Sequence, residues 1–217
     1  MIDFAAAREA MVDCQVRPSD VTSYTIISAM LTVPREDFVP EAQRAVAYAG
    51  EEVPLAPGRV VLDPRVFAKM LDAIDIGPKD LVLDVGSGLG YSAAVIADMA
   101  EAVIALEEDP DLARAAEAAL AAQGVDNAVV ETRPLAGGVP EHGLYDAIVV
   151  EGGAERLPEA LLDQLKPGGR IVAIFMEGAL GQVRLGVKSE RGVAWRRAFD
   201  ASAPVLPGFA AVKAFEF

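Results

Sequence analysis

The segment Leu81-Val82-Leu83-Asp84-Val85-Gly86-Ser87-Gly88-Leu89-Gly90-Tyr91 decides the fold of this 217-residue chain. Its apolar start, residues 81–84, is typical of the end of a buried strand, and a helical run over residues 92–100 follows the segment. Three glycines at alternate positions form the turn between strand and helix. Glycine permits a positive φ, and its missing Cβ lets a ligand approach the backbone. A strand, a glycine turn and a helix in this order begin a doubly wound α/β unit.

The spacing of Gly86, Gly88 and Gly90 indicates which ligand the turn binds. A dinucleotide fingerprint reads G-x-G-x-x-G, whereas this turn reads G-x-G-x-G and follows Asp84. A carboxylate aimed into the pocket would repel a pyrophosphate, but it suits a cationic ligand. A second acid, Glu107, ends the next apolar run, about 20 residues on, where a carboxylate can bind ribose hydroxyls. The alternative interpretation is a glycine-rich turn of some other α/β protein.

Helices and strands alternate along the rest of the chain, which predicts a mostly parallel sheet in a single domain, residues 1–217. We expect a helical N-terminal region with a substrate loop over residues 1–77, and a cofactor-binding α/β core over residues 78–217. In the first part, Asp20 is expected to cap a helix that buries Tyr24. The expected loop spans residues 51–64. The expected strands are 81–84, 103–107, 128–131, 145–150 and 170–175, followed by antiparallel edge strands 182–188, 193–199 and 211–217.

The composition excludes several classes of protein. A 53% share of hydrophobic residues with 24% charged residues predicts a globular chain. The net charge of −14 disfavours nonspecific binding to nucleic acid or anionic membranes. One cysteine, Cys14, and one histidine, His142, exclude a disulfide framework and a thiolate metal cluster within one chain and argue against a multi-histidine metal site, so no metal is expected. Cys14 is expected to be buried. No apolar run is long enough to span a membrane and the first residues do not resemble a signal peptide, so a cytoplasmic protein is expected; its oligomeric state stays open.

Several motifs extend this pattern over most of the chain. The segment from Asp84 reads D-x-G-x-G-x-G, which resembles motif I of the class I S-adenosylmethionine-dependent methyltransferases. Further motifs make the chain similar to the protein-L-isoaspartate O-methyltransferase family. They are Met11-Val12-x-x-Gln15, Ala29-Met30-x-x-Val33-Pro34-Arg35-Glu36-x-Phe38-Val39-Pro40, Ala47-Tyr48, Pro54-Leu55, the strand over 145–150, and the segment over 157–169.

This resemblance implies a Rossmann-like fold and a reaction. Members transfer a methyl group from S-adenosylmethionine to the free carboxylate of L-isoaspartyl residues in damaged proteins, which leaves S-adenosylhomocysteine. The acceptor is then a protein or peptide, and its carboxylate is already ionised at neutral pH, so no general base is required. The residues implied in cofactor binding are Asp84, Gly86, Ser87, Gly88, Gly90, Tyr91 and Glu107. Glu151 departs from the family, which has a small neutral segment there, and its place at the end of a strand makes it a further candidate that faces either the ligand or solvent.

The chain departs from the family pattern in the substrate loop. A family segment G-Q-T-I-S-x-P holds the acceptor carboxylate with hydroxyls, and here it reads Gly58-Arg59-Val60-Val61-Leu62-Asp63-Pro64. Val60 and Leu62 replace the threonine and serine. A carboxylate would lose hydrogen bonds worth roughly 1.5–3 kcal/mol each. Asp63 would also repel it, whereas Arg59 or Arg65 could pair with it.

The family's adenine-binding G-D-G also lacks its acid, because the matching residues are Arg133-Pro134-Leu135. Two functions therefore remain open. One is a methyltransferase that acts on isoaspartyl residues or on a drifted acceptor. The other is a catalytically impaired homologue that binds S-adenosylmethionine or a protein partner as a sensor or interaction module.

Overall fold

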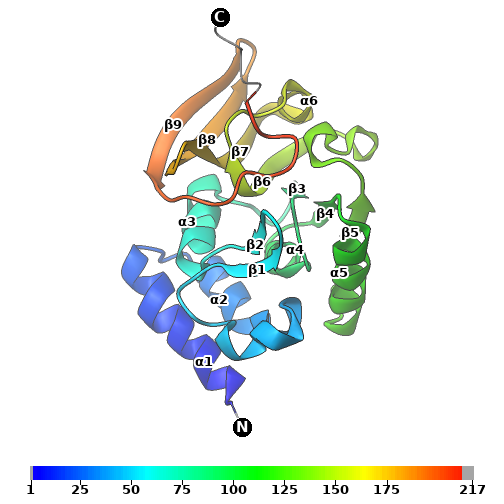
Figure 1. The fold of residues 1–217 in the computed structure, drawn as a ribbon. Helices are drawn as coiled ribbons and strands as arrows, with labels where there is room; N and C mark the ends of the chain where they lie inside the picture. Colours follow the sequence, from blue (N-terminus) through cyan, green and yellow to red (C-terminus); the bar gives the residue numbers. More distant parts are fainter. Residues whose placement is uncertain (1, 212–217) are drawn as a thin grey trace, which may run out of the picture.

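A computed structural model describes residues 2–211 (Figure 1). Its centre is a seven-stranded sheet in the order β5-β4-β3-β6-β7-β8-β9. The strands are β3 (Leu81–Val85), β4 (Ala102–Glu107), β5 (Ala128–Thr132), β6 (Tyr145–Ala154), β7 (Leu165–Glu177), β8 (Leu180–Ser189) and β9 (Gly192–Asp200). Strands β3 to β7 are parallel, and β8 and β9 continue the sheet as antiparallel strands. The predicted fold class is thus confirmed, while the predicted strand over 211–217 lies, apart from Ala211, outside the described residues.

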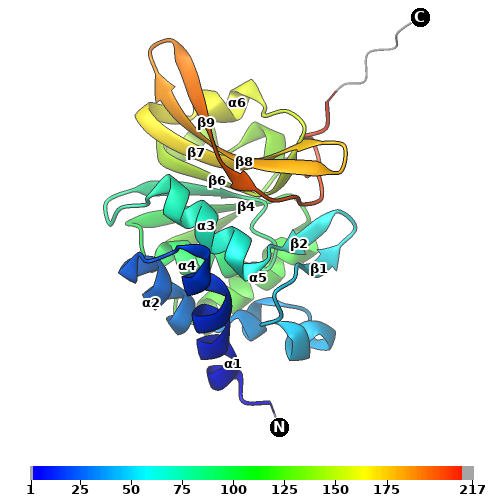
Figure 2. The same ribbon diagram turned by 90° about the vertical axis from the view of Figure 1, so that its left-hand side faces the viewer.

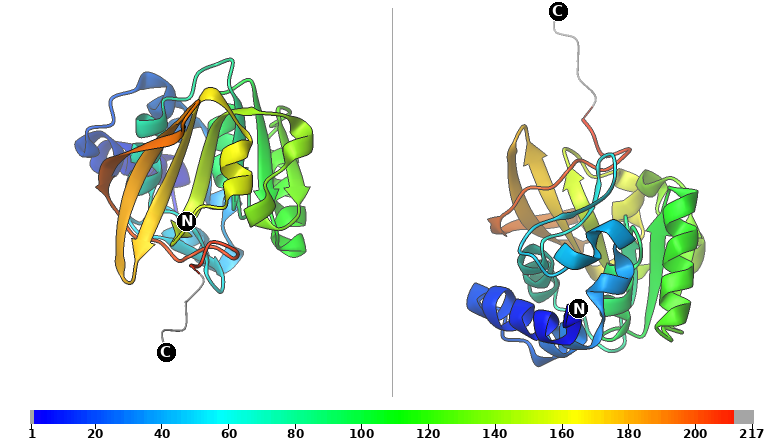
Figure 3. Two further views of the ribbon diagram at one scale, coloured as in Figure 1. Left: turned by 90° about the horizontal axis from the view of Figure 1, so that it is seen from above. Right: turned by 60° about the horizontal axis from the view of Figure 1, so that its bottom comes forward.

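Helices cover both faces of this sheet. The α-helices are α1 (Phe4–Met11), α2 (Tyr24–Thr32), α3 (Pro64–Ile74), α4 (Tyr91–Ala97), α5 (Pro110–Ala122) and α6 (Glu159–Asp163). Seen from above, the N-terminal helices lie on one side of the sheet and α6 on the other (Figure 3, left). No helix within residues 2–211 is long and apolar enough to cross a membrane.

Alternation along the central strands explains why two cores form. In β3, Val82 faces the core shared with α3 and α4, whereas Leu83 faces the core shared with α6 and the chain near Phe209. Successive side chains of a strand point to opposite faces, so a strand that is buried on both faces reads as a continuous apolar run. This is the pattern that predicted the strand from sequence.

The order of the strands fixes where a ligand can bind. The chain runs outward from β3 to β4 and β5, and then crosses back to pair β6 with β3. Connections therefore leave β3 and β6 in opposite directions. In open α/β sheets the carboxyl ends of two such strands border a crevice that binds ligands.

The N-terminal region differs from the sequence expectation at several points. Asp20 has a left-handed backbone (φ 66°) and ends a short 3-10 helix, and it does not cap α2. Tyr24 is 82% exposed because it begins α2 on the solvent side. Cys14 is exposed as well. The expected loop contains a hairpin of β1 (Val53–Ala56) and β2 (Arg59–Val61) (Figure 2).

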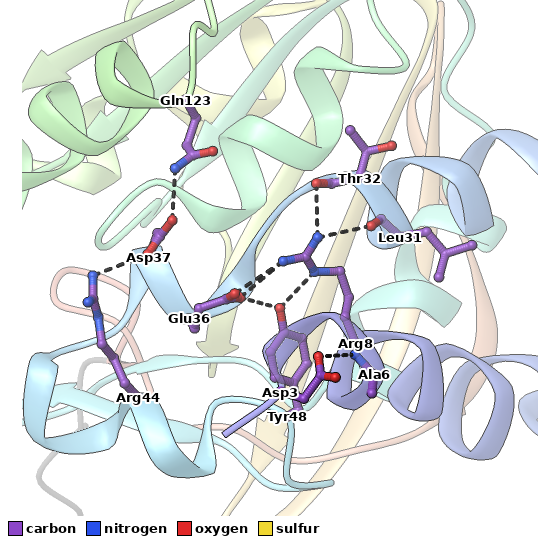
Figure 4. Close-up of polar contacts among 10 residues, drawn as sticks. All are labelled: Asp3, Ala6, Arg8, Leu31, Thr32, Glu36, Asp37, Arg44, Tyr48 and Gln123. Carbon is purple, nitrogen blue, oxygen red and sulfur yellow. Dashed lines mark hydrogen bonds and ion pairs between the residues drawn. The ribbon is translucent and has the colours of Figure 1, made fainter. Parts of the chain in front are cut away.

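A polar network holds α1 against the segments that follow α2 (Figure 4). Arg8 donates from Nε to the Tyr48 hydroxyl at 2.8 Å and from Nη2 to Glu36 Oε1 at 3.1 Å. Tyr48 in turn donates to Glu36. Arg8 also donates to the carbonyl of Leu31, which belongs to the last turn of α2. The network lies mostly out of solvent, with 17% of the Arg8 side chain and 10% of Glu36 exposed.

We predict that Arg8→Met lowers the free energy of unfolding by about 2–4 kcal/mol, because a largely buried carboxylate loses its cation. Urea unfolding measures the change. The matched control is Arg44→Met, which removes an ion pair with Asp37 that is 48% and 36% exposed. That loss should stay below about 1 kcal/mol. Equal losses in the two variants would contradict the role given to the network.

Candidate functional site

Three buried carboxylates lie at the carboxyl ends of adjacent strands. Asp84 is in β3, Glu107 ends β4, and Glu151 is in β6; their exposed fractions are 0%, 0% and 5%. Each lies an even number of residues along its strand from side chains of the core on the α4 side, such as Val82 in β3. Alternate side chains of a strand point to the same face, so all three carboxylates face α4 and the β1–β2 hairpin. This position is the crevice where the strand order reverses. Glu151 is thus buried and does not face solvent, while its role toward a ligand stays a prediction.

Glu107 is engaged by the chain itself. Arg59, in the hairpin, donates from Nη1 to Glu107 Oε1 at 2.6 Å and from Nη2 to Oε2 at 2.7 Å. The backbone amide of Gly88 donates to the same carboxylate at 2.8 Å, and those of Glu108 and Asp109 at 2.9 and 3.0 Å. The acid expected to bind ribose therefore holds an arginine. The arginine considered for an acceptor carboxylate is accordingly already paired.

Asp84 and Glu151 keep oxygens without a partner among the described residues. Ser92 in α4 donates to Asp84 Oδ2 at 2.6 Å, but Asp84 Oδ1 and Glu151 Oε1 have no hydrogen bond. Burial, with a contribution from the Glu107 charge, raises the pKa of Asp84 from 3.8 to about 7, against the Ser92 bond and Arg59, which lower it. Burial and the Asp84 charge raise the pKa of Glu151 well above its usual range. The pair is short of positive charge.

The glycine turn follows the geometry predicted from sequence. Gly86, Gly88 and Gly90 have φ values of 85°, 58° and 92°. Their surroundings differ, however. A Cβ on Gly90 would lie 3.3 Å from Leu120, so this glycine permits close packing of α5. A Cβ on Gly88 would lie 2.5 Å from Leu55 Cδ1, so the hairpin presses on this part of the turn.

The substrate-loop residues line a small cavity at the same place. Its volume is about 10 Å³, room for a single water, and its lining includes Val60, Leu62, Glu151, Ser87 and Tyr91. No hydroxyl stands at the two alkyl positions. Asp63 points elsewhere, since its carboxylate accepts from the amides of residues 65 and 66 and caps α3.

The segment expected beside adenine is also folded onto the chain. Pro134 is exposed, and Leu135 is buried in the core on the α6 side. The amide of Leu135 donates to Glu108 Oε2 at 3.3 Å. A backbone donor at this position is therefore already used by the residue after Glu107.

Sequence reasoning missed three residues that shape the site. Arg35 is fully buried and donates to the carbonyls of Ala47 and Leu62, which anchors the end of the hairpin. Ser92 orients Asp84. Leu206 covers Gly86 and Gly152, because residues 204–206 pair with the end of β6. The family-like V-P-R-E block could have pointed to Arg35, but nothing local to Leu206 marks it.

The residues fit a cationic cofactor at one end of the site. Two unpartnered acid oxygens and the unpartnered Ser87 hydroxyl are buried there beside Gly86. These groups suit an ammonium or sulfonium group such as the methionine portion of S-adenosylmethionine carries. At the other end of the site, Glu107 fits the ribose hydroxyls only when Arg59 leaves it. The cofactor roles of the eight residues named from sequence stay a prediction.

Comparison with known sequences shows which protein family this chain resembles. A model of the family described as "Protein-L-isoaspartate(D-aspartate) O-methyltransferase (PCMT)" matches residues 6–194. The chain is 41% identical over 169 residues to Protein-L-isoaspartate O-methyltransferase 1 of Rhodopseudomonas palustris, covering 78% of this chain and 69% of that one. It is 38% identical over 182 residues to Protein-L-isoaspartate O-methyltransferase 2 of Marinobacter nauticus, covering 83% of each.

Solved structures share the fold. One protein-L-isoaspartate O-methyltransferase superimposes with a TM-score of 0.81 at 23% identity, over 93% of this chain and 66% of that one. A Plasmodium falciparum structure described as such an enzyme, in complex with S-adenosyl-L-homocysteine, gives 0.79 at 24% identity, over 95% and 99%. These likenesses cover the N-terminal helices as well as the sheet.

We predict that Asp84 makes the ligand-free protein less stable as pH rises. Its pKa is higher in the folded chain than in the unfolded chain, so the folded state binds more protons between about pH 4 and 7, and stability falls across that window. Asp84→Asn should remove this dependence and stabilise the protein at pH 8 by as much as about 4 kcal/mol. Thermal unfolding between pH 5 and 8 measures both effects.

The control is Asp146→Asn in the same sheet. Asp146 accepts from Leu81 and Lys166, and these bonds hold its pKa below the usual value despite partial burial. Its contribution to stability is present above about pH 4 and is lost as pH falls, so this variant should lose stability at pH 8. Identical pH profiles for wild type and Asp84→Asn would refute the assignment.

Proposed function

The chain belongs to the protein-L-isoaspartate(D-aspartate) O-methyltransferase family, and from this premise we propose a methyl transfer in which Asp84 and Glu151 hold the positive charge of S-adenosylmethionine. The family's activity makes the chain an S-adenosylmethionine-dependent O-methyltransferase. What is proposed concerns the residues that carry the reaction and the class of acceptor.

A single observation carries the cofactor assignment. Asp84 Oδ1 and Glu151 Oε1 are buried, have no hydrogen-bond partner within residues 2–211, and lie where β3 and β6 end at the reversal of strand order. Leaving charged oxygens without partners in a protein interior is costly, and such groups gather at functional sites. A bound cation would supply the missing partner and return both pKa values toward their usual range.

The chain's residues then act by placement and by exclusion of water. S-adenosylmethionine supplies an electrophilic methyl group on a sulfonium. Val60, Leu62 and Phe67 provide an apolar wall beside Glu151. Arg59 and Leu206 lie within 3.3 Å of the position that a Cβ on Gly86 would take, so a ligand can lie along this part of the turn only after they move. An apolar wall keeps water away from the methyl group, and orientation in a desolvated site can supply several kcal/mol. Neither acid is required to remove a proton from a carboxylate acceptor.

The proposed methyl acceptor is a protein or a peptide. We expect only weak methylation of L-isoaspartyl carboxylates. Val60 and Leu62 offer no donor to a carboxylate, and Arg59 is engaged with Glu107. A cleft of about 510 Å³ opens beside the hairpin, and Glu52 and Asp63 on its wall would repel an anion. Burial and the Asp63 charge raise the pKa of Glu52, and Arg65 is the arginine on the same wall that faces these two acids.

A second function is favoured by the contact between Arg59 and Glu107. Because Glu107, the acid proposed to bind ribose, is paired with Arg59 of the same chain, the protein could sense the cofactor or a protein partner without transferring a methyl group. The same acids serve in both functions. Cofactor affinity and methyl transfer, measured separately, distinguish them.

We predict that calorimetry detects S-adenosylhomocysteine binding, and that Asp84→Asn and Glu151→Gln each weaken it at least about tenfold. Each variant removes a charge-assisted contact to the ammonium group. Glu155→Gln removes the same charge at an exposed residue four positions after Glu151 and should leave the affinity unchanged. No heat of binding at millimolar ligand would overturn the cofactor assignment.

We also predict that turnover of an L-isoaspartyl peptide is about two to four powers of ten below that of a family member with threonine and serine at these positions, because two contacts worth roughly 1.5–3 kcal/mol each are missing. Transfer of a tritiated methyl group measures this. Val60→Thr, which keeps the side-chain volume, should raise the rate about tenfold or more.

Leu62→Ser is a poorer test, since Leu62 is 2% exposed in the core and its truncation costs stability. Wild-type turnover equal to that of the comparison enzyme would sink the proposal. A rate unchanged by Val60→Thr would direct attention to Glu151 or to the segment at residues 133–135.

A further inference from the structure

The nucleoside end of the site is satisfied by the chain's own groups, whereas the methionine end is not. Arg59 pairs with the carboxylate of Glu107, and the Gly88 amide donates a hydrogen bond to the same carboxylate. The Leu135 amide donates to Glu108. The oxygens without partners, Asp84 Oδ1 and Glu151 Oε1, belong to the other end. The nucleoside end of the site therefore has its hydrogen-bond partners already, whereas the methionine end lacks a cationic partner.

We propose that Arg59 is an internal competitor for the ribose subsite, so that the β1–β2 hairpin must release Glu107 before the cofactor can bind. The inference rests on the proposed function, because it assigns Glu107 to the cofactor. Its consequence is that Arg59 sets cofactor affinity. The residue acts through Glu107 and touches no reacting atom.

The geometry of Arg59 supports competition. Two parallel bonds of 2.6 and 2.7 Å occupy both carboxylate oxygens, and 4% of the Arg59 side chain is exposed. Paired oxygens in this arrangement face the guanidinium, which is planar and matches a carboxylate edge. Ribose hydroxyls would have to take the same edge, because the remaining contacts of Glu107 come from the backbone of its own turn and of Gly88.

Apolar contacts close the site in the same way. Leu55, in β1, approaches Gly88 so closely that a Cβ there would lie 2.5 Å from its Cδ1. Leu206 comes within 3.3 Å of the position a Cβ on Gly86 would take. The space at the methionine end, beside Gly86 and Glu151, is closed as well, since its volume of about 10 Å³ has room for a single water. Release of Arg59 and movement of Leu55 therefore belong to one opening step.

Within the described residues, the hairpin has no strand pairing with the main sheet, so it can open without breaking that sheet. It forms a separate two-stranded sheet of four and three residues, and its turn residues Pro57 and Gly58 are exposed. An isolated two-stranded hairpin is marginally stable. Its base, opposite the turn, is fixed, since Arg35 donates to the Leu62 carbonyl. A hinge at that end would swing Arg59 and Leu55 together away from the glycine turn.

The test compares S-adenosylhomocysteine binding by calorimetry in wild type, Arg59→Gln and Arg65→Gln. Arg65 is an exposed arginine on the same segment, so both variants lose one positive charge. Arg59→Gln should bind about tenfold or more tightly, because the competing charge-assisted contact is gone. Arg65→Gln should match wild type. Leu55→Ala, which leaves the ion pair intact, should give a smaller rise.

Hydrogen exchange provides a readout that needs no ligand. Amides of residues 53–61 should exchange faster in Arg59→Gln than in wild type or Arg65→Gln. Equal or weaker ligand binding by both Arg59→Gln and Leu55→Ala, or unchanged exchange in Arg59→Gln, would overturn the inference. Tighter binding without methyl transfer would leave it standing and refute only the acceptor chemistry. Absence of binding in every variant would overturn it together with the proposed cofactor role.

Discussion

The buried ion pair between Arg59 and Glu107 is the contact on which the arrangement of the site depends. It joins the hairpin to the end of β4, and Glu107 passes the constraint to the glycine turn through the Gly88 amide. Desolvating two charges is costly, and removal of one partner leaves the other buried and uncompensated. The hairpin, the turn and the strand ends are therefore held in one closed arrangement. The same acid cannot serve a ligand while this contact persists.

The rest of the site carries an excess of negative charge that a stable interior would avoid. Asp84 and Glu151 have oxygens that no described residue satisfies. Burial raises the pKa of both, with a contribution from the Glu107 charge for Asp84 and from the Asp84 charge for Glu151. Such a cost persists where a ligand repays it. In this chain the cost is placed at the reversal of strand order, where an α/β sheet offers an open crevice. Membership in an O-methyltransferase family agrees with a cationic ligand there.

The N-terminal region supports the site from a distance. Arg8, Glu36 and Tyr48 tie α1 to the segment that carries Arg35, and Arg35 in turn holds the end of the hairpin through the Leu62 carbonyl. Side chains in the hairpin thus depend on packing more than forty positions earlier in the chain. The alkyl side chains at residues 60 and 62 belong to this framework and pack with the core on the α4 side. Any substitution at these two positions therefore acts on packing as well as on the proposed recognition of the acceptor.

The sequence by itself determined the features that depend on local order. Apolar runs of strand length, the glycines that need a positive φ, and acids at strand ends are read directly, because alternation and turn geometry involve neighbouring residues. The parallel sheet, its antiparallel edge and the position of Asp84, Glu107 and Glu151 followed from them. The hairpin, the left-handed Asp20 and the exposure of Tyr24 did not, since tertiary packing overrides local preference there. Only the tertiary structure decided that Arg59 meets Glu107 across 48 residues, and that Leu55 and Leu206 close over the glycine turn. Partners so distant in sequence are chosen by the folding of the whole chain, and no local pattern records that choice.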